Sequence, residues 1–290
     1  MAPIVLWVGL GNMGRGMCKN IVEKGPQEAP LLIYNRSKQR AVDLSAKLAS
    51  GKTEVVESLS DAVAKANIIF TCLANDEAVK EVHEIMLKND VEGKVFVESS
   101  TIHPDITETL AKAAIAKGQL IGVLAGPTSS VEKVRPWFKG VTSRAEIDLS
   151  DQPYSKAATL KLLGNTFVLN TVEQLAEVHV VAEKSGLGTQ PVHQLIESLF
   201  PGLYSTYSTR MLSGDYHKRE EPLFAVDLAR KDARHARSLA KSVGVALHNV
   251  ETADAHLAVV KEHVGSSGDI AAIYGAVRKE AGLPFENEGY

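Results

Sequence analysis

The chain has 290 residues, 44% of them hydrophobic, and a formal net charge of −3 at pH 7. This length allows two cores of ordinary domain size. The slightly acidic balance gives no general positive field for nucleic acid or anionic lipid, so neither is expected as a partner. The apolar start, 4–10, is too short to span a bilayer and has no basic leader. Cys18 and Cys72 lie in segments expected to be buried, which is typical of a reducing compartment, so cytoplasm is expected.

The first half of the chain alternates apolar runs of strand length with segments of helical periodicity. Strands that alternate with helices pair in parallel and form a doubly wound sheet. The sequence therefore predicts an α/β domain over residues 1–152. The predicted strands are 4–9, 31–34, 67–73, 94–98, 120–124 and 145–149, and the predicted helices are 13–24, 41–49, 105–117 and one that ends near Phe138.

After Pro153 the strand signals stop and only helical patterns remain. Between Tyr154 and Ser185 apolar residues recur at helical spacing without proline, and Gly186 supplies a stop. At 1.5 Å per residue such a helix is about 45 Å long. The second domain, 153–290, is therefore predicted to be all-helical, and we expect the two domains to meet directly and to form a cleft. Further helices are predicted over 191–199, 223–243, 249–263 and 268–281.

A glycine-rich turn joins the first predicted strand to the first predicted helix. Gly9, Gly11 and Gly14 spell GLGNMG, which follows an apolar strand, opens a helix and precedes a second strand. This context matches the dinucleotide fingerprint of a Rossmann domain, whose glycines let the backbone approach a pyrophosphate at the helix N-terminus. The alternative is a tight turn without a ligand. The candidate cofactor contacts are Gly9, Leu10, Gly11, Asn12, Met13 and Gly14.

The end of the second strand carries no carboxylate, although chains that bind NAD usually have Asp or Glu there for the ribose hydroxyls. A carboxylate would repel a 2′-phosphate, whereas Arg36 offers a planar fork beside Ser37 and Lys38. The sequence therefore predicts NADP(H), with contacts from Asn35, Arg36 and Ser37, and disfavours NAD(H). The alternative is that Arg36 is a solvated surface charge.

Five motifs follow one another along most of the chain. They are GLGNMG at 9–14, TCLAND at 71–76, ESSTIHP at 98–104, KLLGN at 161–165 and, more weakly, ARKDARHA at 229–236. Together they resemble the β-hydroxyacid dehydrogenase family, which includes 3-hydroxyisobutyrate dehydrogenase, glyoxylate/succinic semialdehyde reductase and 6-phosphogluconate dehydrogenase. The resemblance implies an oxidoreductase that transfers a hydride between NADP(H) and a small hydroxy acid or aldehyde acid. It also implies a homodimer or homotetramer formed through the helical domain.

Lys161 is a candidate on its own pattern as well. It lies in a predicted helix that is apolar nearly all round, and Asn165 follows one turn later on the same face. A buried polar pair needs a reason. Hydride transfer to a carbonyl leaves an alkoxide that needs a proton, and the resemblance implies Lys161 as the general acid/base and Asn165 as the group that orients the substrate. Burial or a neighbouring positive charge would have to lower the pKa of Lys161; the alternative is a lysine that extends to solvent.

The resemblance implies further contacts from three other segments. For the serine and threonine of ESSTIHP the alternative is ordinary capping before Pro104, and for Lys231 it is a solvated helix face with ion pairs. No metal site is predicted. Position alone suggests that Tyr204, Tyr207 and Arg210 influence substrate selectivity. The implied contacts are Ser100 and Thr101 for the substrate, and Leu73, Ala74, Asn75, Thr101 and Lys231 for the cofactor.

One part of the family pattern is missing. Family members usually carry another strand and a small-residue loop of the type DAPVSGG, which binds the substrate carboxylate, but here Gly118 leads directly into the strand near Gln119. A second function therefore stays open, a catalytically impaired NADPH-binding protein. An imine-reducing relative is disfavoured because Lys161 is retained where such enzymes often depart from lysine.

Overall fold

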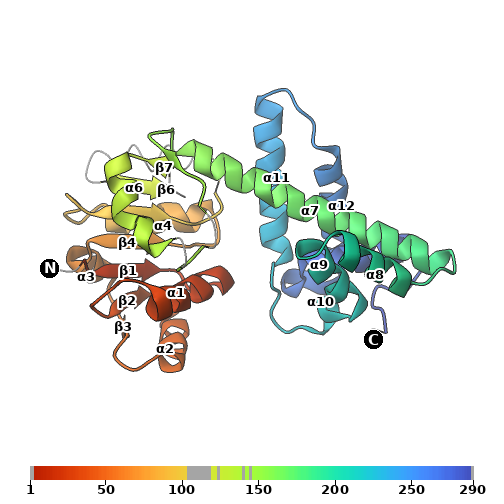
Figure 1. Ribbon diagram of the computed structural model, residues 1–290, viewed down its shortest axis with the longest axis horizontal. Helices are drawn as coiled ribbons and strands as arrows, with labels where there is room; N and C mark the ends of the chain where they lie inside the picture. Colours follow the sequence, from red (N-terminus) through yellow and green to blue (C-terminus); the bar gives the residue numbers. More distant parts are fainter. Residues whose placement is uncertain (1–2, 103–118, 123–124, 139–140, 144–145, 289–290) are drawn as a thin grey trace. The chain divides into compact units, whose positions relative to one another are not determined.

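The computed structural model contains two compact units, residues 1–161 and 162–290. The long helix α7, Ser155–Lys184, begins in the first unit and continues into the second. The sequence analysis instead divides the domains at the loop before this helix, between residues 152 and 153. The described residues are 3–102, 119–122, 125–138, 141–143 and 146–288 (Figure 1).

The first unit is built on one eight-stranded sheet with the order β3-β2-β1-β4-β5-β6-β7-β8. All neighbouring strands are parallel except β6 and β7. The chain runs outward from β1 to β3 on one side and from β4 onward on the other, so the order reverses beside β1. Ligands bind at such a reversal in doubly wound sheets. The strands are β1 Val5–Val8, β2 Leu31–Tyr34, β3 Thr53–Val55, β4 Ile68–Thr71, β5 Val95–Glu98, β6 Gln119–Gly122, β7 Ala125–Gly126 and β8 Leu149–Ser150.

Alternate residues of the central strands pack into two separate cores, one on each face of the sheet. Trp7 and Phe70 stack with ring centroids 5.5 Å apart on the face covered by α1 and α2. Leu6 and Ile69 point to the other face, against α3 and α4. Burial on both faces explains why these strands read as continuous apolar runs. The helices are α1 Asn12–Lys24, α2 Lys38–Lys47, α3 Leu59–Lys65, α4 Asp76–Met86, α6 Thr128–Val134 and the 3₁₀ turn η1 Arg135–Trp137.

The predicted doubly wound domain is confirmed, with some differences in its elements. The sequence analysis missed β3, α3, α4 and β7. Strand β3 is a three-residue edge strand without a fully buried position. The predicted helix over 105–117 lies outside the described residues. The last predicted strand, 145–149, overlaps the observed β8 only at Leu149, and residues 146–148 are irregular.

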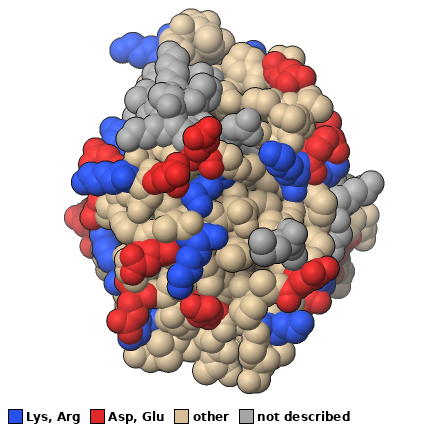
Figure 2. Space-filling model, turned by 90° about the vertical axis from the view of Figure 1, so that its left-hand side faces the viewer, with Lys and Arg blue, Asp and Glu red and all other residues tan. Residues whose placement is uncertain are grey.

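Figure 2 shows one face of the molecule with its charged side chains coloured by sign. Lysine and arginine side chains are interspersed with aspartate and glutamate side chains on this face. Within the described residues, no helix is both long enough and apolar enough to span a membrane.

The second unit is helical, as predicted, and its helices surround one core. The sequence analysis missed α9 and α10, although Tyr207 and Met211 of α9 belong to this core. Its elements after α7 are α8 Thr189–Leu199, α9 Leu203–Leu212, α10 Asp215–Lys218, α11 Val226–Ser242, α12 His248–Val264, the 3₁₀ turns η2 Gly265–Ser267 and η3 Ile270–Ala272, and α13 Ile273–Glu280.

A histidine between two carboxylates joins three of these helices. His256 of α12 lies between Glu173 of α7, 2.7 Å from Nδ1, and Glu280 of α13, 2.9 Å from Nε2. The hydrogen bond with Glu173, reinforced by Glu280, raises the pKa of His256 to about 9. The imidazole is therefore charged at neutral pH and bridges the three helices.

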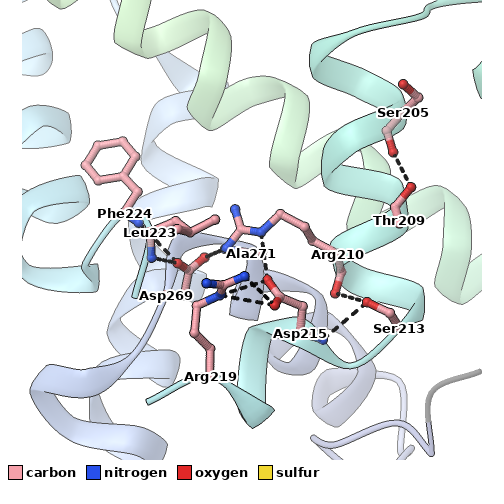
Figure 3. Close-up of polar contacts among 10 residues, drawn as sticks. All are labelled: Ser205, Thr209, Arg210, Ser213, Asp215, Arg219, Leu223, Phe224, Asp269 and Ala271. Atoms are coloured by element: carbon pink, nitrogen blue, oxygen red, sulfur yellow. Dashed lines mark hydrogen bonds and ion pairs between the residues drawn. The ribbon is translucent and has the colours of Figure 1, made fainter. Parts of the chain in front are cut away.

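Asp269 is the polar centre of the helical unit (Figure 3). This carboxylate is 1% exposed and accepts a hydrogen bond from Arg210 Nη2 at 2.7 Å. It also accepts hydrogen bonds from the backbone N–H groups of Leu223, Phe224 and Ala271. One side chain thus fixes the loop before α11 to the start of η3. Arg210 in turn contacts the partly exposed Asp215 through Nε at 3.0 Å, and Arg219 binds the same carboxylate.

Asp269→Ala is expected to lower the free energy of unfolding of the helical unit by about 3–5 kcal/mol, because it leaves Arg210 and three backbone donors without this acceptor. Asp215→Ala, at a more exposed site, is the matched control and should cost about 1 kcal/mol. Urea unfolding followed by circular dichroism measures both. Equal losses in the two variants would contradict a central role for Asp269.

Candidate functional site

Steric contacts determine the shape of the turn between β1 and α1. Gly9 has φ +100°, and a Cβ there would lie 2.3 Å from the carbonyl oxygen of Cys72. A Cβ on Gly14 would lie 2.2 Å from the carbonyl oxygen of Gly9. At Gly11, the N-cap of α1, a Cβ would meet no atom within 4 Å, and glycine supplies no side-chain cap to the first-turn amides. The turn therefore keeps its backbone amides beside open space, the arrangement that binds a pyrophosphate.

The end of β2 holds this glycine turn in place. Gly9 N donates to Tyr34 O at 3.0 Å, and Leu10 N donates to Asn35 Oδ1 at 2.9 Å. The Asn35 amide also donates to Ser37 O at 3.0 Å. Asn35, predicted as a direct cofactor contact, thus positions the turn on which the cofactor contacts depend. Met13, another predicted contact, is 69% exposed at the start of α1.

The segment after β2 presents the predicted phosphate-binding residue. Arg36 is exposed, as are Ser37 and Lys38. Lys38 Nζ lies 2.5 Å from Glu57 Oε1, and this hydrogen bond lowers the pKa of the Glu57 carboxyl. Lys38 is thus engaged by a neighbouring carboxylate, which leaves Arg36 as the cation that the sequence prediction depends on.

Two motifs far apart in the sequence meet at the carboxyl ends of β4 and β5. Leu73 N donates to Ser100 Oγ at 2.7 Å, which joins the TCLAND and ESSTIHP segments. Asn75 is the N-cap of α4 and accepts from Ala78 N at 2.9 Å. Ala74 is exposed and Thr101 is half-buried. The serine of ESSTIHP therefore contacts the neighbouring cofactor loop; helical capping after it concerns residues outside the described part.

Sequence reasoning missed a buried carboxylate two residues before Ser100. Glu98, the last residue of β5, is 5% exposed and accepts from Ser100 N at 2.7 Å and from Thr71 Oγ1 at 2.9 Å. The sequence did offer a signal for Glu98, because a charged residue at the end of an otherwise apolar strand needs hydrogen-bond partners.

The helical part of the site centres on a buried amide. Asn165 of α7 is 8% exposed, and its Nδ2 donates to Asp232 Oδ2 of α11 at 2.6 Å. Asp232 Oδ1 lies 3.3 Å from Lys231 Nζ. Lys231 is 9% exposed, unlike a lysine on a solvated face. The sequence analysis noted Asp232 beside Lys231 and did not give it a role in the site.

Lys161 lies one turn before Asn165, but it is exposed. Of the buried polar pair that the sequence analysis expects on one face of this apolar helix, Asn165 is buried and Lys161 is not. Leu163 and Phe167 are 44% and 73% exposed. At this point of α7 the buried face is the one that carries Leu162, Asn165 and Leu169. The burial that the sequence analysis invoked for Lys161 is therefore not present.

The residues suggested for substrate selectivity lie in the helical core. Arg210 pairs with Asp215 and Asp269 in the network around Asp269, and its guanidinium stands 5.1 Å from the ring centroid of Tyr207. Tyr204 packs on Phe200 with centroids 5.2 Å apart. Arg210 therefore stabilises the helical unit. Within the described residues no group of three or more His, Cys, Asp or Glu could hold a metal ion.

Comparisons with known proteins agree with the glycine turn and with the helical motifs. Residues 5–133 match the family model of the NAD binding domain of 6-phosphogluconate dehydrogenase, and residues 155–277 match that for NAD binding of NADP-dependent 3-hydroxyisobutyrate dehydrogenase. The chain is 34% identical to the NADH-dependent oxidoreductase ucdB of Aspergillus ustus, over 94% of this chain and 98% of the relative. The chain belongs to the β-hydroxyacid dehydrogenase family.

Two solved structures have a similar fold. The 3-hydroxyisobutyrate dehydrogenase of Mycobacterium tuberculosis, solved with L-serine, has a TM-score of 0.76 and 21% identity over 96% of this chain and 100% of that chain. A structure described as Psf3 in complex with NADP+ and 2-OPP has a TM-score of 0.79 and 20% identity over 94% and 100%. As a member of the β-hydroxyacid dehydrogenases, the protein is an NAD(P)-dependent dehydrogenase that acts on CH–OH groups.

Gly14→Ala is expected to weaken binding of NADPH or NADH by about tenfold or more, because the new Cβ would overlap the Gly9 carbonyl and displace the turn. Gly16→Ala is the matched control on the same helix, where a Cβ meets nothing within 4 Å. This control should keep the affinity and stabilise α1 by about 0.5–1 kcal/mol. Fluorescence titration of the reduced cofactor gives the affinities. Unchanged binding by Gly14→Ala would show that the turn does not hold the dinucleotide.

Proposed function

We propose that the protein transfers a hydride between NADP(H) and a small hydroxy acid or aldehyde acid, with Lys161 as the general acid/base. The observation that carries this proposal is the buried hydrogen bond between Asn165 and Asp232, one helical turn from Lys161. A buried amide held by a carboxylate at 2.6 Å has a fixed orientation, as a group that positions a substrate requires. The nicotinamide supplies the hydride acceptor or donor when it is bound.

Lys161, Asn165 and Lys231 have separate roles in this proposal. Lys161 gives a proton to the developing alkoxide, or removes one from the alcohol in the reverse direction. Asn165 directs Nδ2 to Asp232, so its carbonyl edge faces away from that carboxylate and presents an acceptor to the substrate hydroxyl. Lys231, within 3.3 Å of Asp232, offsets the carboxylate charge beside the amide and supplies the predicted cofactor contact.

The proposed preference for NADP(H) rests on Arg36. Arg36 is an exposed cation that follows β2, whereas Lys38, also exposed, is paired with Glu57. The structural neighbour with NADP+ supports this assignment, whereas the relative from Aspergillus ustus is named as NADH-dependent. NAD(H) is therefore the competing cofactor, and the two are separated by the binding experiment below.

A second candidate function is an impaired enzyme that binds NADPH without efficient turnover. The alignment with the Aspergillus ustus oxidoreductase extends over 292 positions, more than the 290 residues of this chain, while it covers only 94% of them. The relative therefore carries residues that this chain lacks, consistent with a missing loop after Gly118. Loss of a loop that binds the substrate carboxylate would raise KM first, because the acid/base and the cofactor turn lie elsewhere.

We further propose a homodimer or homotetramer in the cytoplasm. Exposed apolar side chains on the second unit support association through that unit. The two free cysteines, one of them buried, are consistent with a reducing compartment. The mixed charges in Figure 2 support a small-molecule substrate rather than nucleic acid or a membrane surface. The exposed apolar residues include Leu163, Phe167, Val181, Leu195, Leu199 and Phe200.

Arg36→Ala is expected to weaken NADPH binding roughly ten- to hundredfold and to leave NADH binding unchanged, since a hydrogen bond to a charged group is worth about 1.5–3 kcal/mol. Arg40→Ala, an exposed arginine one turn further along, is the matched control and should bind NADPH normally. Titration of both cofactors against the three proteins decides the preference. Equal or tighter binding of NADH by the unmutated protein would refute the proposed NADP(H) specificity.

Lys161→Ala is expected to lower kcat by about 10²- to 10⁴-fold with little change in NADPH affinity, since proton transfer is lost and the dinucleotide site is intact. Lys156→Ala on the same helix controls for the loss of an exposed lysine. Steady-state rates with NADPH and a panel of small keto acids and semialdehydes provide the measurement. If Lys161→Ala retains most of the rate, the acid/base is another group. NADPH binding without turnover on any substrate would favour the impaired enzyme, and insertion of a family-type strand and loop after Gly118 should then restore activity.

A further inference from the structure

Glu98 is a buried carboxylate that the proposed chemistry does not use. Both of its oxygens accept hydrogen bonds, Oε1 from Ser100 N at 2.7 Å and Oε2 from Thr71 Oγ1 at 2.9 Å. Burial of a charged group is costly unless such partners are present. The placement of Glu98 at the carboxyl end of β5 therefore fixes the backbone that follows the strand.

His83 of α4 faces the same carboxylate from the other side. It is 1% exposed, and Nε2 lies 3.8 Å from Glu98 Oε2. Its Nδ1 contacts Val79 O at 2.9 Å, which sets the orientation of the ring because a carbonyl can only accept. Ring contact with Phe96, at 6.3 Å between centroids, further restricts it. Glu98 is thus held by hydrogen bonds from the Thr71 side chain of β4 and from the Ser100 backbone, and the buried His83 ring packs beside it.

The hydroxyl of Ser100 is oriented by its neighbours on both sides. Its backbone N–H is bound by Glu98, and its Oγ accepts the N–H of Leu73 at 2.7 Å. A hydroxyl that accepts in one direction has its proton in another, so Ser100 is set to act as a donor toward an oxygen acceptor. Glu98 and Leu73 together determine where that donor points.

We propose that Glu98 is a positioning residue for hydride transfer, which acts by holding Ser100 so that its hydroxyl donates to an oxygen of the bound reactants. The acceptor is either the carboxamide oxygen of the nicotinamide or an oxygen of the substrate. This inference rests on the proposed function. Neither Glu98 nor His83 touches the reactants in this role; both act through the turn that contains Ser100.

The test combines two substitutions of Glu98 with the presence or absence of the Ser100 hydroxyl. Glu98→Ala removes the acceptor of Ser100 N–H, and we expect kcat/KM to fall about tenfold or more. Glu98→Gln keeps a carbonyl oxygen for Ser100 N–H and places its amide near Thr71, whose hydroxyl can accept, so it should recover most of the activity. In the Ser100→Ala background, Glu98→Ala should have no further effect, because its influence passes through that hydroxyl.

The kinetic constants also identify the acceptor. The acceptor is the carboxamide if Glu98→Ala raises the Kd for NADPH but leaves the affinity for adenosine 2′,5′-bisphosphate unchanged, because that compound lacks the nicotinamide. A raised substrate KM with unchanged NADPH binding assigns it to the substrate. Equal losses from Glu98→Ala with and without the Ser100 hydroxyl would overturn the proposal and leave Glu98 a purely structural residue.

Amide hydrogen exchange separates failure of this inference from failure of the proposed function. Glu98→Ala should speed the exchange of the backbone amides of Leu73 and Ser100, and Ser100→Ala should speed that of Leu73. In Glu98→Gln these amides should exchange slowly, as in the unmutated protein, and the amides of β1 should stay protected in every variant. If no substrate is turned over, the proposed function fails, but faster exchange in Glu98→Ala would still support the positioning of Ser100. Unchanged exchange would overturn it whether or not the protein is active.

Discussion

The close approach of three backbone segments at the ends of β1 and β4 is the constraint on which the cofactor site depends. Gly9 passes so near the carbonyl of Cys72 that no side chain fits between them, and Gly14 approaches Gly9 equally closely. This contact brings the N-terminus of α1 next to the loop that follows β4. The loop in turn holds Ser100 through Leu73, so a restriction on one glycine propagates to the residue after β5. Replacement of either glycine would move elements of three motifs at once.

Buried carboxylates have comparable tasks in the two units. Asp269 collects one guanidinium and three backbone donors and thereby fixes a loop. Glu98 holds the turn at Ser100, and Asp232 orients the amide of Asn165. In each case the desolvation cost is offset by hydrogen bonds from donors whose direction matters. The difference lies in what is oriented, since Asp269 stabilises the fold, whereas Glu98 and Asp232 lie beside candidate site residues.

Local patterns predicted those parts of the structure that depend on neighbours in sequence. The glycine turn, the central strands and the long helix follow from spacing and periodicity alone. The polar contacts of the site join residues far apart, such as Thr71 with Glu98 and Asn165 with Asp232, so no local pattern reveals them.

Helix α9 escaped prediction for a related reason. Its sequence, rich in serine, threonine and tyrosine, has weak helical preference, and burial of side chains such as Met211 stabilises it instead. An apolar sequence does not show which face of a helix is packed, so the sequence analysis left a solvent-exposed Lys161 open as the alternative, and Lys161 is exposed in the structure. The resemblance to known enzymes supplied the role of this residue, but not its surroundings.

The pairing of β5 with β6 bears on the strand and loop that the sequence analysis expects to be missing after Gly118. Strand β6 pairs in parallel with β5 over four residues, with Gln119 opposite Val95. Ladder hydrogen bonds involve only backbone groups, so a following strand can occupy this place in the sheet without the side chains of the missing segment. The carboxyl ends of β1, β2, β4 and β5, where the cofactor residues lie, keep their order. The dinucleotide turn and the Glu98–Ser100 contact therefore lie at the ends of strands that are paired on both sides, and the sequence difference after Gly118 does not include them.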